Sequence, residues 1–204
     1  MENAEGLVEL TRRGVTPDFV KSLGDIAISV LTPDMEKVLR KLLIWENDES
    51  IRHLHLVTRS EEEFKNLKVT FDELLENVRR VHESGKAFFW SIFYQDEPVG
   101  ILTAQIDPKQ LHRKIPGTFW PSILIGEAAA RGKGVGRQAM IWCEELAREM
   151  GCSRIELGVF EFNDIARKLY ESLGYIEFAR IPDFTWWNGE LRTDIRLEKY
   201  LLSE

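Results

Sequence analysis

Cysteine is scarce in this chain, and long apolar runs are absent. The 204 residues include two cysteines, Cys143 and Cys152, which form no Cys-x-x-Cys pair. Paired-cysteine metal and redox motifs are therefore excluded, and packing in the core is the expected role of both thiols. No apolar stretch approaches the ~20 residues that a membrane-spanning helix needs, and the first residues lack a basic and then apolar leader. These absences predict a cytoplasmic protein with no metal site and no membrane partner.

An excess of positive charge is also missing. The 27 lysines and arginines are outnumbered by 34 acidic residues, so the formal net charge is -7. A general nucleic-acid binder is usually basic, and nucleic acid is therefore not an expected partner. Acidic residues gather at residues 46–49 and 61–63. The second group is typical of a solvated helix start, whereas the first is either a solvated helix end or a negative rim that attracts cationic amines.

The length suits one domain with a single core, and the chain has no internal repeat and no low-complexity tract. Residues 1–24 mix Gly6, Gly14, Pro17 and Gly24 with short apolar stretches. This mixture predicts an N-terminal extension, either a tail or a helix that packs on the outside. The domain itself is expected over residues 25–204.

Hydrophobic periodicity outlines the first half of the domain and its end. Residues 25–31 alternate like a strand, a helix starts near Pro33, and a second helix is expected over 70–83. Residues 87–94 and 99–106 predict a hairpin that turns at 95–98. Residues 175–187 and 190–200 flank Asn188-Gly189, a strong signal for a two-residue hairpin turn.

The most informative stretch is Arg131-Gly132-Lys133-Gly134-Val135-Gly136, which is followed by Arg137. It lies between an apolar run, Ile123-Leu124-Ile125, and a helical pattern that begins near Gly136. Glycines at a strand-to-helix turn let the backbone approach a ligand, and the helix start favours negative charge. With three cations around it, the turn predicts a cradle for a pyrophosphate.

Other glycine loops fit this stretch less well. A P-loop would have Lys-Ser or Lys-Thr after its last glycine, and none follows here. In a dinucleotide fingerprint that starts at Gly132, the third glycine would fall on Arg137. A flexible turn without a ligand remains the plain alternative.

Two helical patterns frame a strand after the glycine turn. The first carries an apolar stripe and ends near Gly151, a strand follows over 154–159, and Asn163 opens the second helix, which stops at Gly174. The stripes consist of Ala139, Cys143, Leu146, Ala147 and Met150 in the first helix and of Ala166, Leu169, Tyr170 and Leu173 in the second.

With these motifs in this order, the chain resembles the GNAT superfamily of acetyl-CoA-dependent N-acetyltransferases. The family's pyrophosphate motif is matched by Arg131, Gly134 and Gly136, and its second signature by Asn163 followed by residues 166–175, ARKLYESLGY. The resemblance runs from about residue 25 to the C-terminus. The first half looks like the branch that acts on protein N-termini, polyamines or small amines, although that part of the match is loose.

The resemblance implies the fold and the cofactor. It implies an α+β (α/β) fold with a mixed, mostly antiparallel sheet of six or seven strands flanked by about four helices. Two central strands would splay, with the pantetheine arm of acetyl-CoA in the gap. The implied cofactor-binding residues are Ile123, Leu124, Ile125, Arg131, Gly132, Lys133, Gly134, Val135, Gly136, Arg137, Asn163 and Arg167.

The resemblance also points to catalytic residues. Tyr170 is the expected general acid, since it lies two turns from Asn163 on nearly one helix face, but its stripe position also fits a core aromatic. Asn163 is expected to hold the cofactor, and it also fits an N-cap. Glu127 is the expected general base, with an exposed loop acid as the alternative, and His112 is expected at the surface.

For the acceptor, the expected binding residues are Glu46, Asp48 and Trp120. Trp186 and Trp187 suit the acceptor side, packing on an edge strand or a dimer contact equally well. The predicted activity is direct transfer of an acetyl group to a primary amine, a small molecule or a protein N-terminus, within a ternary complex. If Trp186 and Trp187 form a dimer contact, the protein is a homodimer. The alternatives are a non-catalytic acyl-CoA sensor on the same fold and, less favoured, a nicotinamide oxidoreductase.

Overall fold

One mixed sheet organises the part of the chain that this computed structural model describes, residues 20–84 and 87–201. The strand order is β1-β2-β3-β4-β5-β6-β8-β7, and every neighbouring pair is antiparallel except β5 and β6. The strands are β1 (Val20–Leu23), β2 (Ile26–Val30), β3 (Ala87–Tyr94), β4 (Glu97–Ile106), β5 (Thr118–Ile125), β6 (Arg154–Phe160), β7 (Ile176–Trp187) and β8 (Glu190–Tyr200).

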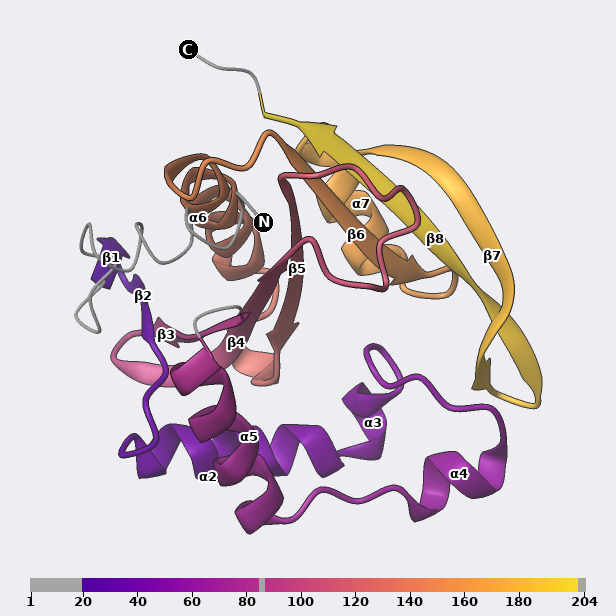
Figure 1. The fold of residues 1–204 in the computed structure, drawn as a ribbon. Helices are drawn as coiled ribbons and strands as arrows, with labels where there is room; N and C mark the ends of the chain where they lie inside the picture. Colours follow the sequence, from indigo (N-terminus) through magenta and orange to yellow (C-terminus); the bar gives the residue numbers. More distant parts are fainter. Residues whose placement is uncertain (1–19, 85–86, 202–204) are drawn as a thin grey trace.

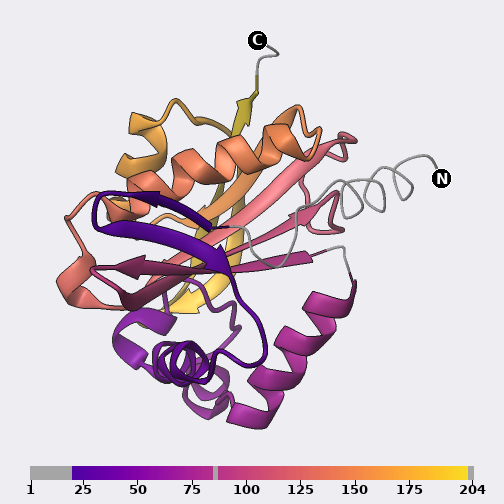
Figure 2. The same ribbon diagram turned by 90° about the vertical axis from the view of Figure 1, so that its left-hand side faces the viewer.

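Helices cover both faces of the sheet, as Figures 1 and 2 show. One face carries the two helices that follow the glycine turn, α6 (Val135–Glu149) and α7 (Asp164–Ser172). The opposite face carries the helices of the first half, α2 (Glu36–Asn47), α3 (Glu49–Arg52), α4 (Glu61–Asn66) and α5 (Phe71–Ser84). A single 3-10 turn, η1 (Ala128–Ala130), joins β5 to α6 within the described segments.

Each face has its own apolar core. The larger core lies under α6 and α7 and includes Phe119, Met140 and Leu146, which are fully buried. The smaller core packs α2 and α5 onto the sheet around Leu39 and Val78. Burial of such side chains contributes roughly 1.5–3 kcal/mol each, which is why the amphipathic stripes decide where the helices dock.

The stripes predicted for the helices after the glycine turn are confirmed. Gly151 follows α6 with a φ of 72°, as expected for a glycine that ends a helix. Cys143 and Cys152 are free and buried, which agrees with a packing role. Burial raises the pKa of the Cys152 thiol to about 12, so this thiol stays protonated.

The predicted fold class is confirmed, but the described residues form eight strands and six α-helices, more than expected. The extra strand is β1, which lies in the region assigned to the N-terminal extension and pairs with β2. The extra helices are α3 and α4, which are too short to show a periodic stripe. Residues 1–19 lie outside the described residues, so the division into an extension and a domain stays a prediction.

Both hairpins form where the sequence predicts them. Asn188 and Gly189 have φ values of 52° and 91° and link β7 to β8. The first hairpin is tighter than expected, because β4 begins at Glu97 and leaves a two-residue turn at Gln95 and Asp96. Across the ranges that the structure describes, no helix combines the length and the apolar character needed to span a membrane.

Candidate functional site

The two central strands separate soon after they start. The ladder between β5 and β6 joins Thr118 to Arg154 and Phe119 to Ile155, although β5 continues to Ile125 and β6 to Phe160. A cavity of about 580 Å³ opens between the separated halves. From Trp120 onward, the edge of β5 that faces β6 pairs with no strand among the residues that the structure describes. Such an edge offers backbone hydrogen-bonding groups to an extended ligand.

The glycine turn closes one end of this cavity. Gly132 and Gly134 have φ values of 70° and 81°, a conformation that side chains other than glycine disfavour. Gly134 is also the N-cap residue of α6, so the first amide groups of this helix have no partner within the helix. A Cβ built at either glycine would meet no atom within 4 Å, which shows that the turn faces open space. The turn therefore has the geometry of an anion cradle.

The cations of the turn lie in different places. The Arg131 guanidinium donates to the carbonyl oxygens of Ile125 and Gly126, both at 3.2 Å, and so holds the turn against the end of β5. Arg137 donates to the Ser172 hydroxyl at 3.0 Å, which links α6 to α7. Lys133 is exposed and does not line the cavity. Arg131 and Arg137 are thus fixed at the cavity wall, while Lys133 stands outside it.

Most of the residues predicted for the site lie around this one cavity. The predicted residues that belong to its lining are Trp120, Ile123, Leu124, Ile125, Arg131, Gly132, Gly134, Val135, Gly136, Arg137, Asn163 and Tyr170. Five predicted residues are not in the lining, namely Glu46, Asp48, Glu127, Lys133 and Arg167. Arg167 donates to the carbonyl oxygen of Glu161 and to Asp164, both at 3.3 Å.

Tyr170 combines the two roles considered for it. The residue is buried in the core beneath α7, with its ring 5.8 Å from the ring of Tyr175, and it also lines the cavity. Burial raises the pKa of the Tyr170 phenol above its ordinary value, so the phenol keeps its proton at neutral pH. Asn163 caps α7 by accepting the Ala166 amide at 3.2 Å and lines the cavity as well.

The contacts of Glu127 argue against its expected role as general base. Its carboxylate accepts Lys41 Nζ at 2.6 Å and Trp45 Nε1 at 3.2 Å, outside the cavity lining. The bond from Lys41, assisted by Trp45, holds the pKa of this carboxyl below its ordinary value. A carboxylate with a lowered pKa is a weaker base, and this one points to α2. The alternative, an acid that makes a surface contact, fits better.

The acidic residues before α3 reach the cavity only indirectly. Glu46 lies 3.1 Å from His55 Nε2, and His55 lines the cavity. Asp48 is exposed and caps α3 by accepting the Ser50 amide at 2.9 Å. The hydrogen bonds from Ser50 keep the pKa of the Asp48 carboxyl low, with a smaller contribution from Arg131. Asp48 is therefore a helix cap near the glycine turn, and Glu46 orients a histidine of the cavity wall.

The tryptophans at the second hairpin pack within the chain. Trp187 stacks on the ring of His53 at 3.9 Å, and the Trp186 amide donates to the Thr58 carbonyl oxygen at 2.7 Å. Neither residue lines the cavity. Their contacts join the tip of β7 to the segment after α3, so the ring of Trp187 is already engaged in an internal contact.

A charged wall of the cavity was missed by the sequence analysis. Asp194 and Arg196 of β8 line the cavity and are 3% and 4% exposed. Burial raises the pKa of the Asp194 carboxyl to about 6, against the opposing effect of Arg196. A signal was present, because Arg192, Asp194, Arg196 and Glu198 alternate with less polar residues. Alternation of this kind usually marks a solvent-facing strand, and this face is covered in the fold.

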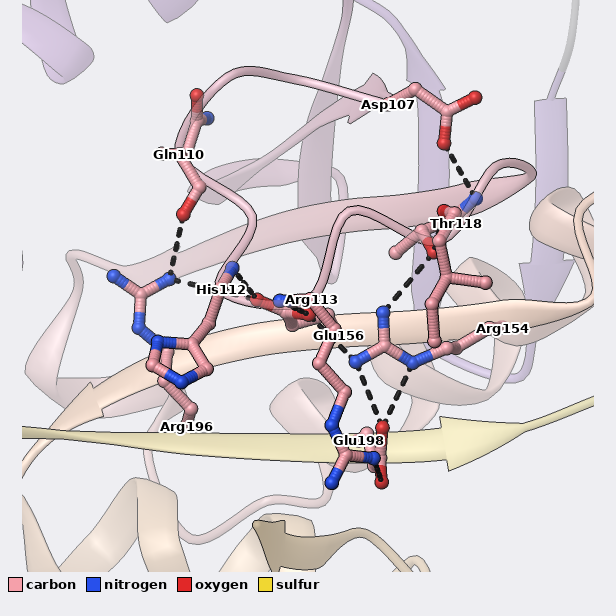
Figure 3. Close-up of polar contacts among 10 residues, drawn as sticks. Asp107, Gln110, His112, Arg113, Thr118, Arg154, Glu156, Arg196 and Glu198 are labelled. Carbon is pink, nitrogen blue, oxygen red and sulfur yellow. Dashed lines mark hydrogen bonds and ion pairs between the residues drawn. The ribbon is translucent and has the colours of Figure 1, made fainter. Parts of the chain in front are cut away.

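Figure 3 shows the buried ionic network that continues from this wall. Arg154 is fully buried and contacts Glu156 at 2.6 Å, Glu198 at 2.8 Å and the Thr118 hydroxyl at 3.2 Å. Glu156, also fully buried, accepts the backbone amides of His112 and Arg113. Arg154 thus lies in the first pair of the β5–β6 ladder, where the two strands are still joined, and Glu156 fastens the 107–117 loop onto the sheet.

The loop that the network fastens forms part of the cavity wall. Gln110 lines the cavity, and its carbonyl oxygen accepts Arg196 Nη1 at 3.3 Å. Asp107 accepts the amides of Gly117 and Thr118 and so closes the loop at its base. The side chain of His112 is exposed at the surface, as expected, while its backbone amide carries the contact to Glu156.

Comparisons with known proteins agree with this geometry. The family model described as "Acetyltransferase (GNAT) family" matches residues 44–175. A similar curated protein is the "Uncharacterized N-acetyltransferase YdgE" of Bacillus subtilis, which is 33% identical over 115 residues, or 56% of this chain and 69% of that protein.

Solved structures share the fold at low sequence identity. A ribosomal-protein-S5-alanine acetyltransferase from Vibrio fischeri superimposes with a TM-score of 0.69 at 14% identity, over 90% of this chain and 97% of that one. A spermidine N-acetyltransferase from Vibrio cholerae, in complex with CoA and spermine, has a TM-score of 0.69 at 19% identity, over 88% and 97%. At these identities, the likeness concerns the fold.

Proposed function

The chain belongs to the acetyltransferase (GNAT) family, whose members use acetyl-CoA, and we propose that it transfers the acetyl group directly to a primary amine in a ternary complex. The observation that carries this proposal is the cavity between β5 and β6, which has the glycine turn at one end and Tyr170 in its wall. The glycine turn can bind the cofactor, the free edge of β5 can hold the thioester, and Tyr170 can donate a proton. Acyl transfer from a thioester to an amine uses each of these.

The residues of the cavity fit coenzyme A. The turn at Gly132 and Gly134 presents the unpaired amides of α6 to a pyrophosphate, with Arg131 and Arg137 at the wall. The edge of β5 from Trp120 to Ile125 would bind the pantetheine arm as an added strand, and Asn163 faces the same space. When bound, acetyl-CoA supplies the activated acetyl thioester.

Tyr170 would hold the proton that the leaving sulfur needs. Its burial keeps the phenol protonated at neutral pH, and its position in the cavity wall places that proton beside the ligand space. Backbone amides on the free edge of β5 would stabilise the negative charge that develops on the carbonyl oxygen. Tyr170 also packs in the core and β5 also belongs to the sheet, and these contacts keep both groups rigid.

The absence of a suitable cysteine supports direct transfer. Neither Cys143 nor Cys152 lines the cavity, and both are buried. Burial raises the pKa of both thiols, so neither offers the thiolate that an acyl-cysteine route needs. The amine would therefore enter while acetyl-CoA is bound.

The acceptor side of the cavity suits an amine with an apolar part. Trp120, Phe160 and Phe184 line it, together with Asp194 and the His55–Glu46 pair behind it. Two of the structural neighbours are a spermidine acetyltransferase and a ribosomal-protein alanine acetyltransferase. Polyamines and protein N-termini are therefore the first acceptor classes to test.

A two-part experiment tests this function. Calorimetry with acetyl-CoA measures binding, and release of free thiol against a panel of polyamines, small primary amines and peptides with free N-termini measures turnover. We expect binding, turnover with at least one amine, and kinetics in which lines of 1/v against 1/[S] intersect. Parallel lines would contradict the ternary complex.

The Tyr170→Phe variant separates catalysis from binding. We expect it to keep its affinity for acetyl-CoA and to lose turnover by roughly 100-fold or more, the scale of a lost general acid. Binding without turnover of any amine by the unaltered protein would instead indicate an acyl-CoA sensor on this fold. Absence of binding would refute the function altogether.

A further inference from the structure

We propose that Asp194 is the general base that takes the proton from the acceptor amine, and that Arg196 is the positioning residue that holds it. This inference rests on the proposed function and adds to it the residue at which the amine is bound and deprotonated. It replaces Glu127, whose carboxylate is engaged by Lys41 and Trp45 outside the cavity lining.

The location of Asp194 follows from the sheet register. Phe160 is the last residue of β6 and pairs with Asp194 on β8, so Asp194 lies beside the end of β6 that has separated from β5. Its side chain lines the cavity and is 3% exposed. Tyr170 lines the same cavity from α7, on the other face of the sheet. An acid and a base therefore reach one cavity from opposite faces.

The space that Asp194 occupies is left by a missing side chain. A Cβ built on Gly158 would lie 2.9 and 3.0 Å from the two carboxylate oxygens of Asp194. Gly158 pairs with Arg196 across the β6–β8 ladder and lines the cavity itself. Because no side chain stands on β6 at this point, the carboxylate lies directly against the strand.

Arg196 fixes the carboxylate without saturating it. Its Nε lies 2.6 Å from Asp194 Oδ2, an ion pair that engages one of the two carboxylate oxygens. The guanidinium itself is held by the Gln110 carbonyl oxygen, by Glu156 at 4.0 Å and by the Trp120 ring, whose centre is 4.7 Å from Cζ. Asp194 therefore keeps hydrogen-bonding capacity for an amine.

The surroundings make Asp194 a better base than an ordinary aspartate. Burial raises the pKa of its carboxyl to about 6, and Arg196 acts in the opposite direction. Other charged or titratable groups also lie near this wall. Glu156 belongs to β6, and His55 and Arg59 follow α3. Arg192 belongs to β8 and pairs with Glu190. At neutral pH the carboxyl is ionised, and its pKa lies closer to the working pH than the usual 3.8.

The proton balance of the transfer is complete with these two residues. As the neutral amine forms its bond to the carbonyl carbon and the bond to sulfur breaks, Asp194 accepts the proton that leaves nitrogen. Tyr170 gives its proton to the sulfur. Exchange of the two protons through solvent restores both side chains, so the products are an amide and a free thiol.

The test uses the Asp194→Asn variant with an amine that the unaltered protein acetylates. We expect kcat/KM to fall about 100- to 10,000-fold, the range for a lost general base, while calorimetric affinity for acetyl-CoA stays the same. Glu190→Gln is the matched control, because it neutralises an exposed acid on the same strand, outside the cavity lining. This control should keep full turnover.

The pH profile distinguishes a base from a structural residue. In the unaltered protein, kcat/KM should rise with pH through an ionisation near 6, and this step should be missing in Asp194→Asn. His55, which also lines the cavity and lies beside Glu46, is the alternative base. The His55→Gln variant should therefore retain the step.

The outcomes separate this inference from the function on which it rests. Failure of the unaltered protein to bind acetyl-CoA or to acetylate any amine overturns both. Turnover in the unaltered protein that persists undiminished in Asp194→Asn, or a step that disappears in His55→Gln, overturns the role of Asp194 alone. If Asp194→Asn does not fold, the profiles of the unaltered protein and His55→Gln decide, and a profile without an ionisation between about pH 5 and 7 overturns the inference.

Discussion

Replacing Asp194 by asparagine should change how the stability of this protein depends on pH. Asp194 is 3% exposed, and burial raises the pKa of its carboxyl from 3.8 to about 6. In the unfolded chain the carboxyl returns to its ordinary pKa. Between the two values the folded protein holds a proton that the unfolded chain has released, so lowering the pH through this interval favours the folded state.

The size of the effect follows from the shift. A difference of about two pKa units corresponds to about 3 kcal/mol, since each unit is about 1.4 kcal/mol. This unfavourable contribution is present in full above the folded pKa and is relieved as the pH falls toward the unfolded one. The asparagine side chain does not titrate. The unaltered protein should therefore gain about 3 kcal/mol of unfolding free energy relative to Asp194→Asn between about pH 7 and pH 4.

Urea unfolding of both proteins at closely spaced pH values measures this difference. The other carboxyl groups titrate alike in both proteins, so their effects cancel in the difference, provided that they do not contact Asp194. The Glu190→Gln variant, altered at an exposed site on the same strand, should show a difference that is flat with pH. A flat difference for Asp194→Asn as well would show that this carboxyl ionises as it does in water, and the reasoning about a buried base would be refuted.

Three further substitutions test other parts of the site. Gly158→Ala places a Cβ against the Asp194 carboxylate and should lower kcat/KM about 100-fold with unchanged coenzyme A affinity, because displaced catalytic groups lose alignment; normal turnover would contradict the close packing. Glu127→Gln should leave kcat/KM within about threefold and lower stability by less than about 1 kcal/mol, since the pair with Lys41 is partly exposed; a large loss of turnover would restore Glu127 as the base. Arg154→Met should cost about 3–5 kcal/mol in urea unfolding, because it removes the buried cation that contacts both Glu156 and Glu198. The exposed Arg180→Met should cost far less, and equal losses would count against the buried network.

The features that could be predicted from the sequence are those set by residues close together in the chain. The glycine turn, the N-cap at Asn163 and the hairpin turn at Asn188-Gly189 each depend on a few consecutive residues. The helix stripes depend on spacings of three and four positions. The short helices α3 and α4 were not predicted, because a helix of one or two turns shows no periodic pattern of apolar residues.

The site residues also differ in whether their positions depend on neighbours in the chain or on distant segments. Tyr170 and Asn163 belong to a contiguous signature and lie in the cavity as expected. Glu127 follows β5 directly in the chain, yet its contacts are with Lys41 and Trp45 of α2, which pull its carboxylate away from the cavity. Proximity along the chain did not reveal which helix would pack over the end of that strand.

The family, the glycine turn and most of the helices and strands could be read from the amino-acid sequence, because these depend on local backbone preferences and on the period of apolar residues. That the alternating charges of β8 face inward became evident from the folded chain alone. There, the 107–117 loop covers them, Arg154 and Glu156 join them to the separating strands, and Asp194 lies against Gly158. Burial of a charge depends on which distant segments cover it, and alternation along one strand is the same whether that face meets solvent or protein.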